Sequence, residues 1–230
     1  MAKSSPFEQV HLQMGAQMGD YYGWRLPIRY STLEAEKHAL DTHCAAFDLC
    51  GFGRISVKGR DAEVVLAEAG LTNLPDYSSQ QWIWAGSETE KAHRIAALRN
   101  EYIVISTPGN SLFTAVGDII QKQKRDATVA DLSEKTAFLG LYGPGAFESV
   151  GKLLPFEIDE LTVGSAMPVS FFMMNFILLR GSWLNGDGLE LFCPASAAGL
   201  VGGSIAKYRQ KYNITPAGME CLMTAMVTGK

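Results

Sequence analysis

The sequence has few cysteines and no motif that would link them to a metal or a redox reaction. The four residues Cys44, Cys50, Cys193 and Cys221 form no CxxC pair, which argues against a zinc ribbon or a thioredoxin-like site. The first six residues contain no apolar segment of the kind found in secretory signals, so we expect no targeting peptide. Together these absences predict reduced thiols in a cytoplasmic protein.

Excess positive charge and long apolar runs are also missing. The 20 lysines and arginines are outnumbered by 24 acidic residues, and the net charge of -4 argues against a nucleic-acid partner. No run reaches the roughly 18 apolar residues of a membrane helix, so no membrane partner is expected. His38 and His43 are five residues apart and do not share a helical face, so we expect no metal.

The composition is that of a globular protein with a substantial core. Hydrophobic residues make up 47% of the 230 residues and charged residues 19%. At roughly 100–200 residues per domain, this length fits one large domain or two small ones.

The stretch from Phe171 to Phe192 organises the second half of the chain. The apolar run 171–179 and the alternating residues 189–192 predict two strands around a turn, in which Gly186 and Gly188 supply positive φ. Successive strand residues alternate sides, so Glu190 faces away from its apolar neighbours. Two interpretations stay open. Glu190 is an ordinary solvent-facing residue of a hairpin, or it lies in a pocket and accepts paired N–H donors from a heterocycle.

Helices and strands alternate along the rest of the chain. A capping box formed by Ser31 and Glu34 predicts a helix that begins there and continues to about Thr42. Residues 14–30, rich in glycine, aromatics and proline, predict irregular backbone. Periodicity predicts the remaining elements: strands at 52–58, 81–85, 94–98, 101–107, 128–132 and 136–142, helices at 61–69, 110–124, 143–154 and 195–212, and a final strand within 214–227.

Several of these segments, taken in order, resemble the glycine cleavage T-protein family. The resemblance is carried by the run Gly15 to Tyr30, then Glu36-Lys-His-Ala-Leu, Leu139-Gly-Leu-Tyr-Gly-Pro-Gly-Ala, and the motif from Trp183 to Leu191. The resemblance covers nearly the whole chain. It implies an α+β fold of two interlocked antiparallel-sheet units with flanking helices. The first unit is expected at 1–50 and 136–230, and the second is expected as an insertion at 51–135.

The family uses tetrahydrofolate, and the resemblance implies which residues bind it. Glu190 matches the family position whose carboxylate accepts a bidentate hydrogen bond from the pterin, a strong charge-assisted contact. Trp183 stands where the family has tyrosine, and Asp187 matches in place. Arg180 and Arg25, with Arg29 beside it, are candidates to bind the negatively charged folate tail.

Other positions depart from the family pattern. The stretch Glu90-Lys-Ala-His-Arg-Ile-Ala lacks the family's catalytic aspartate, and His93 and Arg94 stand near its place. A cationic side chain cannot replace a carboxylate beside a developing iminium ion. The family's late Arg-Leu-Glu is replaced by Met223-Thr224-Ala225. The chain also ends at Lys230, where the T-protein continues into a further barrel domain.

These departures leave several functions open, and no catalytic residue is assigned. The first is a tetrahydrofolate-dependent aminomethyltransferase that transfers one-carbon units. The second is a non-catalytic folate-binding or structural subunit of an amine-oxidising or demethylating complex, similar to the gamma subunit of sarcosine oxidase. A folate protein of iron–sulfur cluster upkeep ranks behind them, because its cysteine motif is missing. A vestigial pocket that binds nothing is the last alternative.

Overall fold

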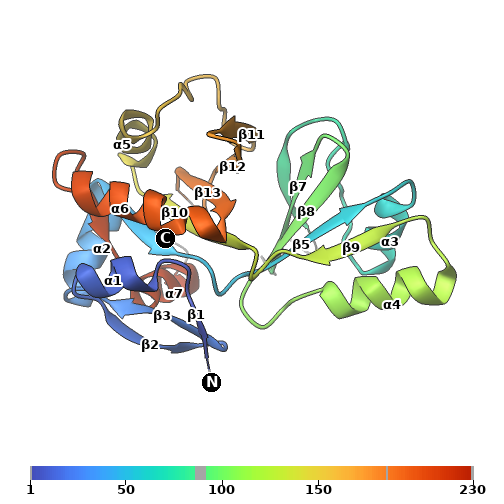
Figure 1. The fold of residues 1–230 in the computed structure, drawn as a ribbon, viewed down its shortest axis with the longest axis horizontal. Helices are drawn as coiled ribbons and strands as arrows, with labels where there is room; N and C mark the ends of the chain where they lie inside the picture. The colour runs from blue at the N-terminus through green and yellow to red at the C-terminus, as the bar shows by residue number, and fades with distance from the viewer. Residues whose placement is uncertain (1, 86–91, 185, 229–230) are drawn as a thin grey trace. The chain divides into compact units, whose positions relative to one another are not determined.

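A computed structural model describes residues 2–85, 92–184 and 186–228 and shows a mixed α+β fold (Figure 1). The α+β class expected from the sequence is therefore confirmed. The described chain forms two compact units. Unit 1 comprises Met1–Gly51, Thr136–Val163 and Val169–Lys230, and unit 2 comprises Phe52–Lys135 and Gly164–Pro168. The short segment Gly164–Pro168 packs with unit 2, whereas the sequence assigned it to the first unit.

A six-stranded sheet forms the centre of unit 1, in the order β11-β12-β13-β10-β4-β14. The strand β13 pairs antiparallel with both β12 and β10, and β14 runs parallel to β4. The hairpin of β12 and β13 confirms the two strands expected around the 181–187 turn. The bounds are β4 Cys44–Asp48, β10 Thr136–Tyr142, β11 Ala166–Phe171, β12 Met174–Arg180, β13 Gly188–Pro194 and β14 Ile214–Pro216.

A smaller three-stranded sheet and five α-helices complete unit 1. The sheet has the order β1-β3-β2, and a turn at Tyr22 and Gly23, both with positive φ, joins its two longer strands. The strands are β1 Lys3–Ser4, β2 Gln17–Tyr21 and β3 Trp24–Arg29. The helices are α1 Glu8–Gln13, α2 Leu33–Thr42, α5 Ala146–Leu153, α6 Ala198–Tyr208, which follows a 3₁₀ turn at Ala195–Ala197, and α7 Met219–Thr228.

Three predicted segments of unit 1 differ in the structure. Residues 14–30 are not irregular, because β2 and β3 pair there around a bulge between Gln17 and Met18. The run 171–179 is not one strand, because Phe172 and Met173 take φ of 47° and 60° and reverse the chain between β11 and β12. The final strand expected within 214–227 is the short β14 followed by the helix α7.

The helix α2 begins one residue later than the expected capping box. Thr32 is its N-cap, and the Thr32 hydroxyl accepts a 3.2 Å hydrogen bond from the Ala35 N–H. Glu36 lies fully buried in the same helix. The Glu36 carboxylate accepts backbone N–H groups at 2.6 Å from Tyr30, 3.0 Å from Ser31 and 2.9 Å from Gly218. This one side chain therefore joins the start of α2 to the approach to α7.

Unit 2 is a five-stranded antiparallel sheet with two helices. The order is β6-β7-β8-β5-β9, and α3 and α4 pack against the face that carries Ile55, Val57 and Val104. The bounds are β5 Gly53–Lys58, α3 Ala62–Glu68, β6 Trp82–Ala85, β7 His93–Leu98, β8 Glu101–Ser106, α4 Phe113–Gln123 and β9 Thr128–Asp131. These elements confirm the sequence predictions to within one to three residues at each end.

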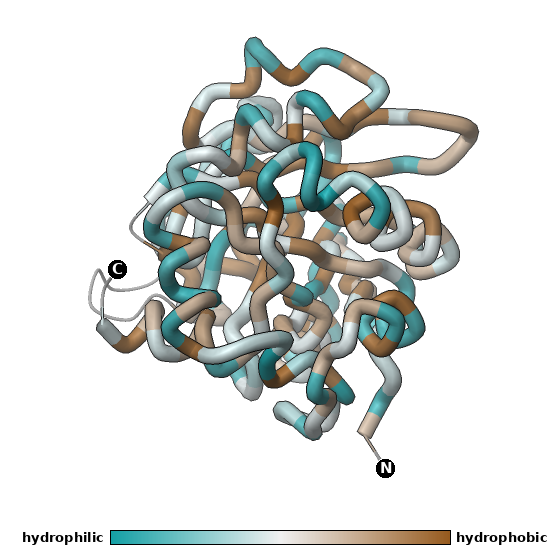
Figure 2. The backbone as a smooth tube through the Cα atoms, turned by 90° about the vertical axis from the view of Figure 1, so that its left-hand side faces the viewer, coloured by the Kyte–Doolittle hydropathy of each residue, from teal (hydrophilic) through white to brown (hydrophobic). Residues whose placement is uncertain are grey.

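Short apolar segments alternate with polar ones along the coloured part of the backbone tube (Figure 2). Among the described helices, none combines the length and the apolar character needed to cross a bilayer. The buried apolar residues lie on the strands of the sheets and on the helix faces that pack against them.

Candidate functional site

Glu190 lies in the middle of β13 and is completely buried. Its neighbours in register are Gly140 on β10 and Leu179 on β12. The solvent-facing interpretation of Glu190 is therefore wrong. A buried carboxylate is costly unless hydrogen bonds compensate for the lost water.

Tyr142 provides one such hydrogen bond. Its phenolic hydroxyl donates to Glu190 Oε1 over 2.6 Å, and both residues are buried. The Tyr142 side chain reaches Glu190 by lying over Gly140. A Cβ atom at position 140 would stand 2.8 Å from the Tyr142 hydroxyl and 2.8 Å from the Leu49 side chain. Glycine in the middle of this strand therefore makes room for the Tyr142–Glu190 contact.

Gly188 has a similar role at the other end of the Tyr142 ring. A Cβ there would lie 2.6 Å from the Tyr142 ring and 2.9 Å from the Leu141 carbonyl oxygen. Gly188 does not have the positive φ expected of it, whereas Gly181 at the start of the loop has a φ of 145°. Gly188 is thus required for close packing against Tyr142, and the chain reversal begins earlier.

The loop between β12 and β13 is fixed by Ser182. Its hydroxyl lies 2.8 Å from the carbonyl oxygens of Leu184 and Gly186, and it accepts a 3.2 Å bond from the Leu184 N–H. Trp183 is held between these contacts and is only 3% exposed. An indole at this position is part of the packed interior of unit 1.

Arg180 and Asp187 are brought together across the base of this loop. Arg180 Nη2 lies 2.9 Å from Asp187 Oδ2, and Arg180 Nε lies 3.4 Å from Asp187 Oδ1. The Arg180 guanidinium also donates a 2.7 Å hydrogen bond to the Leu161 carbonyl oxygen. It lies 3.7 Å from the centre of the Phe147 ring. The Arg180 guanidinium is thus held in a fixed orientation, and the Asp187 carboxylate already balances its charge.

A hollow of about 430 Å³ opens beside the loop. It is lined by Leu40 and Asp41 of α2, by the segment 142–144 and by residues 182, 184, 186 and 187. Tyr142 is one of its walls, so the side chain that binds Glu190 also borders this space. The hollow carries both apolar and polar groups, as small-molecule sites do.

Arg25 is not part of this group. It lies on β3 in the three-stranded sheet, is half exposed, and forms a 2.8 Å ion pair with Glu8. Arg29, on the same strand, faces Glu220 at 3.4 Å. The structure thus brings together Glu190, Trp183, Asp187 and Arg180 in one hairpin, and it places Arg25 on another sheet.

Unit 2 carries His93 and Arg94, the two residues that the resemblance led us to expect near the place of the missing aspartate. His93 Nδ1 lies 2.9 Å from the Ser106 hydroxyl, and burial lowers the pKa of His93. The Arg94 guanidinium is fully buried and lies 4.4 Å from the Trp82 ring centre and 5.4 Å from that of Trp84. Glu90 and Lys91 of the same stretch lie outside the described residues.

A second buried arginine shares the row of Arg94. Arg54 on β5 and Arg94 on β7 both pair with Ile105 of the central strand β8. Directly opposite residues lie on the same face of a sheet, so both guanidinium groups belong to the face opposite α3 and α4. Arg54 Nη1 donates a 2.6 Å hydrogen bond to the Phe52 carbonyl oxygen. This face of unit 2 carries two buried guanidinium groups, and the rings of Trp82 and Trp84 lie beside that of Arg94.

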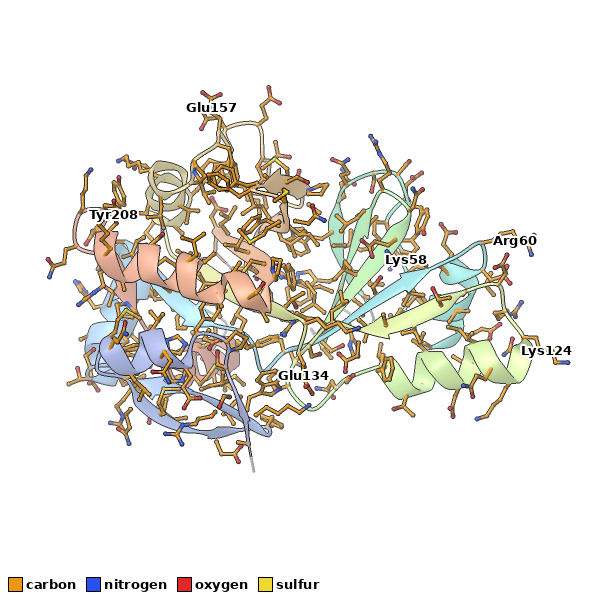
Figure 3. All side chains as sticks on the ribbon, in the orientation of Figure 1. Lys58, Arg60, Lys124, Glu134, Glu157 and Tyr208 are labelled. Carbon is orange, nitrogen blue, oxygen red and sulfur yellow. The ribbon has the colours of Figure 1, made fainter. Side chains whose placement is uncertain are left out.

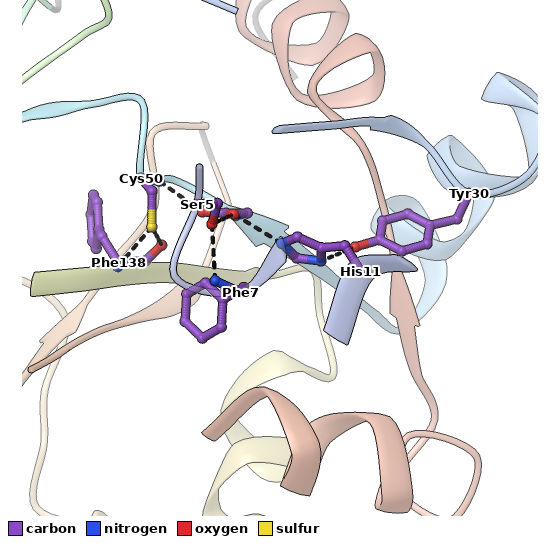
Figure 4. Close-up of polar contacts among 7 residues, drawn as sticks. Ser5, Phe7, His11, Tyr30, Cys50 and Phe138 are labelled. Atoms are coloured by element: carbon purple, nitrogen blue, oxygen red, sulfur yellow. Dashed lines mark hydrogen bonds and ion pairs between the residues drawn. The ribbon is translucent and has the colours of Figure 1, made fainter. Parts of the chain in front are cut away.

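A separate buried polar cluster ties the N-terminal segment to β4 (Figure 4). Asp48 Oδ2 lies 2.9 Å from His11 Nε2 and accepts a hydrogen bond from the Ser5 hydroxyl, and Asp48 Oδ1 accepts 2.8 Å from the Cys50 N–H. The Tyr30 hydroxyl lies 2.5 Å from His11 Nδ1. Burial raises the pKa of Asp48, but the bonds from His11, Cys50 and Ser5 outweigh it and hold the pKa below its ordinary value.

Sequence reasoning missed Tyr142, Gly140 and Glu36 as site or framework residues. A lone glycine at position 140 inside an apolar strand is a known signal of close approach by another group. No local pattern links Tyr142 to Glu190, because 48 residues separate them. Within the described part of the chain, no cluster of histidine, cysteine and acidic side chains is arranged to hold a metal ion.

Comparison with known proteins gives consistent relatives. The chain is 24% identical over 225 residues to an aminomethyltransferase of Saccharopolyspora erythraea, covering 95% of this chain and 61% of the relative. It is 26% identical over 237 residues to an aminomethyltransferase of Cutibacterium acnes, covering 95% and 62%. The chain thus spans less than two thirds of the length of these curated relatives.

Two solved structures share the fold. The glycine cleavage system aminomethyltransferase T from Bartonella henselae superimposes with a TM-score of 0.79 at 18% identity, covering 99% of this chain and 62% of that one. A chain of the heterotetrameric sarcosine oxidase from Corynebacterium sp. U-96 gives a TM-score of 0.59 at 17% identity, covering 80% and 93%. The family model of the GCVT N-terminal domain matches residues 7–227. The chain therefore belongs to the GCVT N-terminal domain family.

Proposed function

We propose that this protein binds tetrahydrofolate, with the Glu190 carboxylate accepting hydrogen bonds from the pterin ring. The observation that supports this most is the burial of Glu190 together with the hydrogen bond from Tyr142. An ionised carboxylate has about four acceptor sites, so a tyrosine that orients it is compatible with further donors. A fixed carboxylate recognises a heterocycle better than a mobile one, because less conformational entropy is lost on binding.

The surrounding hairpin fits this ligand in part. Trp183 packs inside the 181–187 loop and supports its backbone, and Asp187 together with Arg180 forms a pair at its base. We propose that this pair shapes the site and that Arg25, which is half exposed, attracts the acidic folate tail. The existing partners Asp187 and Glu8 weaken the pull of both arginines on an anion.

One-carbon transfer, in the manner of an aminomethyltransferase, is the finer form of this proposal. It is the less favoured form, because the stretch that resembles the family's aspartate motif lacks that carboxylate and has His93 and Arg94 near its place. Arg94 is buried against Trp82, so its cation is fixed in place and cannot stabilise a developing positive charge. Binding without rapid turnover is the activity that the described side chains support best.

A second candidate is a non-catalytic subunit of an amine-oxidising complex. It is favoured by the match to the sarcosine oxidase chain, which is covered over 93% of its length. In this role the protein would bind folate, or only the neighbouring subunits, while another chain performs the oxidation. We also propose a cytoplasmic location, which is supported by four free and buried cysteines.

Calorimetric titration with tetrahydrofolate tests the proposal. We expect saturable binding that Glu190→Gln weakens by about 1.5–3 kcal/mol, the range for a hydrogen bond to a charged group. Glu157→Gln, at the outer end of the loop after α5, is the matched control and should bind as the unaltered chain does (Figure 3). Urea unfolding of each variant checks that Glu190→Gln remains folded.

The two functions are separated by a second assay. Ammonia release from an aminomethylated carrier protein with tetrahydrofolate would support transfer, whereas co-purification with an amine-oxidising flavoprotein would support the subunit. Absence of binding at millimolar tetrahydrofolate, with a folded chain, would rule out the folate proposal itself.

A further inference from the structure

An apolar cavity of about 270 Å³ lies in unit 1, away from the hairpin loop described above. Its floor is a row of three leucines on adjacent strands: Leu178, Leu191 and Leu139, which pair in register across β12, β13 and β10. The walls come from α5 and α6, including Val150 and Ile205. Leu178 at the floor is completely buried, whereas Leu200 and Phe172 at the edge are exposed, so the cavity opens to the surface on one side.

This cavity is separate from the folate-binding candidate. Leu139 and Leu191 alternate along their strands with Gly140 and Glu190. Because successive strand residues point to opposite faces, the cavity lies on the face of the sheet opposite Glu190. A ligand bound here would not contact the Glu190 carboxylate.

The lining selects a hydrocarbon group. Of the 16 residues around the cavity, Ser204 is the one that carries a polar side chain, and none is charged. An engineered cavity of about 150 Å³ with a similar lining stays dry and binds benzene, so a space of 270 Å³ accommodates a larger apolar group. The part of a ligand that enters this cavity is therefore an aliphatic or aromatic group, and any charged group of the ligand stays outside it.

The rim, in contrast, favours a positive charge. The rings of Phe156, Phe171 and Phe172 gather there, with centroids 6.2 Å apart for the first pair and 4.4 Å for the second. Aromatic faces attract ammonium groups through their quadrupoles. Phe172 is 75% exposed and lies in the positive-φ reversal, so its ring is presented at the opening and not packed in the core.

Carboxylates reinforce this preference next to the opening. A neighbouring hollow shares Leu154, Pro155 and Phe156 with the cavity, and its charged residues are Glu148, Lys152, Glu157 and Asp159. Lys152 bonds to Glu148 one helical turn away. The balance of three carboxylates and one ammonium leaves this border negative.

We propose that the cavity binds an alkylammonium ion, with its hydrocarbon chain on the leucine floor and its cationic head at the phenylalanine and carboxylate rim. The ligand class is an aliphatic amine of medium chain length. The proposal does not depend on folate binding, since it concerns the other face of the sheet.

Three probes of equal chain length test this proposal on the full chain: octylamine, octanoate and 1-octanol, titrated by calorimetry at pH 7. We expect one saturable site for octylamine, with octanoate at least about tenfold weaker because of the negative rim. The double variant Glu157→Lys with Asp159→Lys, both exposed, should reverse that order and leave 1-octanol binding unchanged. Val201→Trp, from the cavity wall, should abolish binding of all three probes.

The outcomes are distinct. Failure of all three probes to bind at millimolar concentration overturns the proposal, as does octanoate binding that equals octylamine binding. If Val201→Trp does not fold, chemical-shift changes decide. Octylamine should shift the amides of β12, β13 and α6, and shifts confined to other elements would contradict the assigned cavity.

Discussion

The Tyr142 hydroxyl and the Glu190 carboxylate are joined by a 2.6 Å hydrogen bond between adjacent strands of one sheet. Tyr142 is not opposite Glu190 in register; its partner there is Gly188, and its ring bends over Gly140 to reach the carboxylate. Three positions are therefore coupled: a donor, an acceptor and a glycine that leaves the space between them.

Tyr142→Phe should destabilise unit 1 by about 1.5–3 kcal/mol, because it removes a hydrogen bond to a charged group without changing the packing. The measurement is the urea midpoint with an unchanged m-value. Tyr208→Phe, at the outer end of α6 (Figure 3), serves as the control and should shift the midpoint by less than about 0.5 kcal/mol. An equal effect of both variants would show that the bond does not stabilise the fold.

Gly140→Ala should be destabilising by about 1–3 kcal/mol, since the added Cβ would lie 2.8 Å from the Tyr142 hydroxyl. Gly199→Ala is the matched substitution, in an exposed position of α6 with no atom within 4 Å of the new Cβ. It should stabilise by roughly 0.5–1 kcal/mol through helix propensity. In thermal unfolding, the melting temperature should fall for Gly140→Ala and rise for Gly199→Ala. An unchanged melting temperature for Gly140→Ala would contradict the packing described for Tyr142.

Thr32→Ala should destabilise by about 0.5–2 kcal/mol, whereas Ser31→Ala should change stability by less than about 0.5 kcal/mol. The reason is that Thr32 accepts the Ala35 N–H at 3.2 Å, while the Ser31 hydroxyl makes a 3.5 Å contact with the Thr32 carbonyl. Chemical denaturation of both variants distinguishes them. A larger loss of stability for Ser31→Ala than for Thr32→Ala would show that Ser31 is the N-cap.

Stability should fall in acid through Asp48. Its pKa is lower in the folded protein than in the unfolded chain, so its contribution is complete above the ordinary value near 4 and is lost as pH falls through the lower folded pKa. Asp48→Asn should cost more than about 2 kcal/mol at pH 7, because three hydrogen bonds to a charged group are weakened. The difference in unfolding free energy between this variant and the unaltered chain, measured by urea denaturation, should shrink below about pH 4.

The control for the acid experiment is Asp126→Asn, which alters an exposed carboxylate paired with Arg60 at 3.4 Å. Its unfolding free energy should follow that of the unaltered chain at every pH. A constant gap between Asp48→Asn and the unaltered chain from pH 7 to pH 2 would assign the acid sensitivity to other groups.

The sequence predicted those elements whose apolar residues repeat regularly. Strands 101–107 and 136–142 and the helix of 61–69 were found within three residues of their ends, because alternation and helical spacing are local signals. Residues 14–30 were missed because Pro27 and the many glycines normally indicate turns, although Pro27 here lies on β3 opposite Met18.

The remaining errors have equally specific causes. Phe172 and Met173 have none of the turn chemistry of glycine or asparagine, so nothing local predicts a reversal there. In the candidate site, alternation identified the orientation of Glu190 away from its apolar neighbours. The Tyr142 bond and the three N–H groups bound by Glu36 depend on segments far apart in the sequence, so no window of neighbouring residues contains them.

The position of β4 in its sheet has a consequence for biosynthesis. Cys44–Asp48 pairs on one side with residues 139–142 and on the other with residues 214–216. A ribosome therefore has to translate some 170 further codons before this early strand can acquire its second neighbour, while most of unit 2 is already available as a contiguous nascent segment. During that interval β4 is an exposed edge, and chaperones that shield unpaired strands would act on this part of the nascent chain.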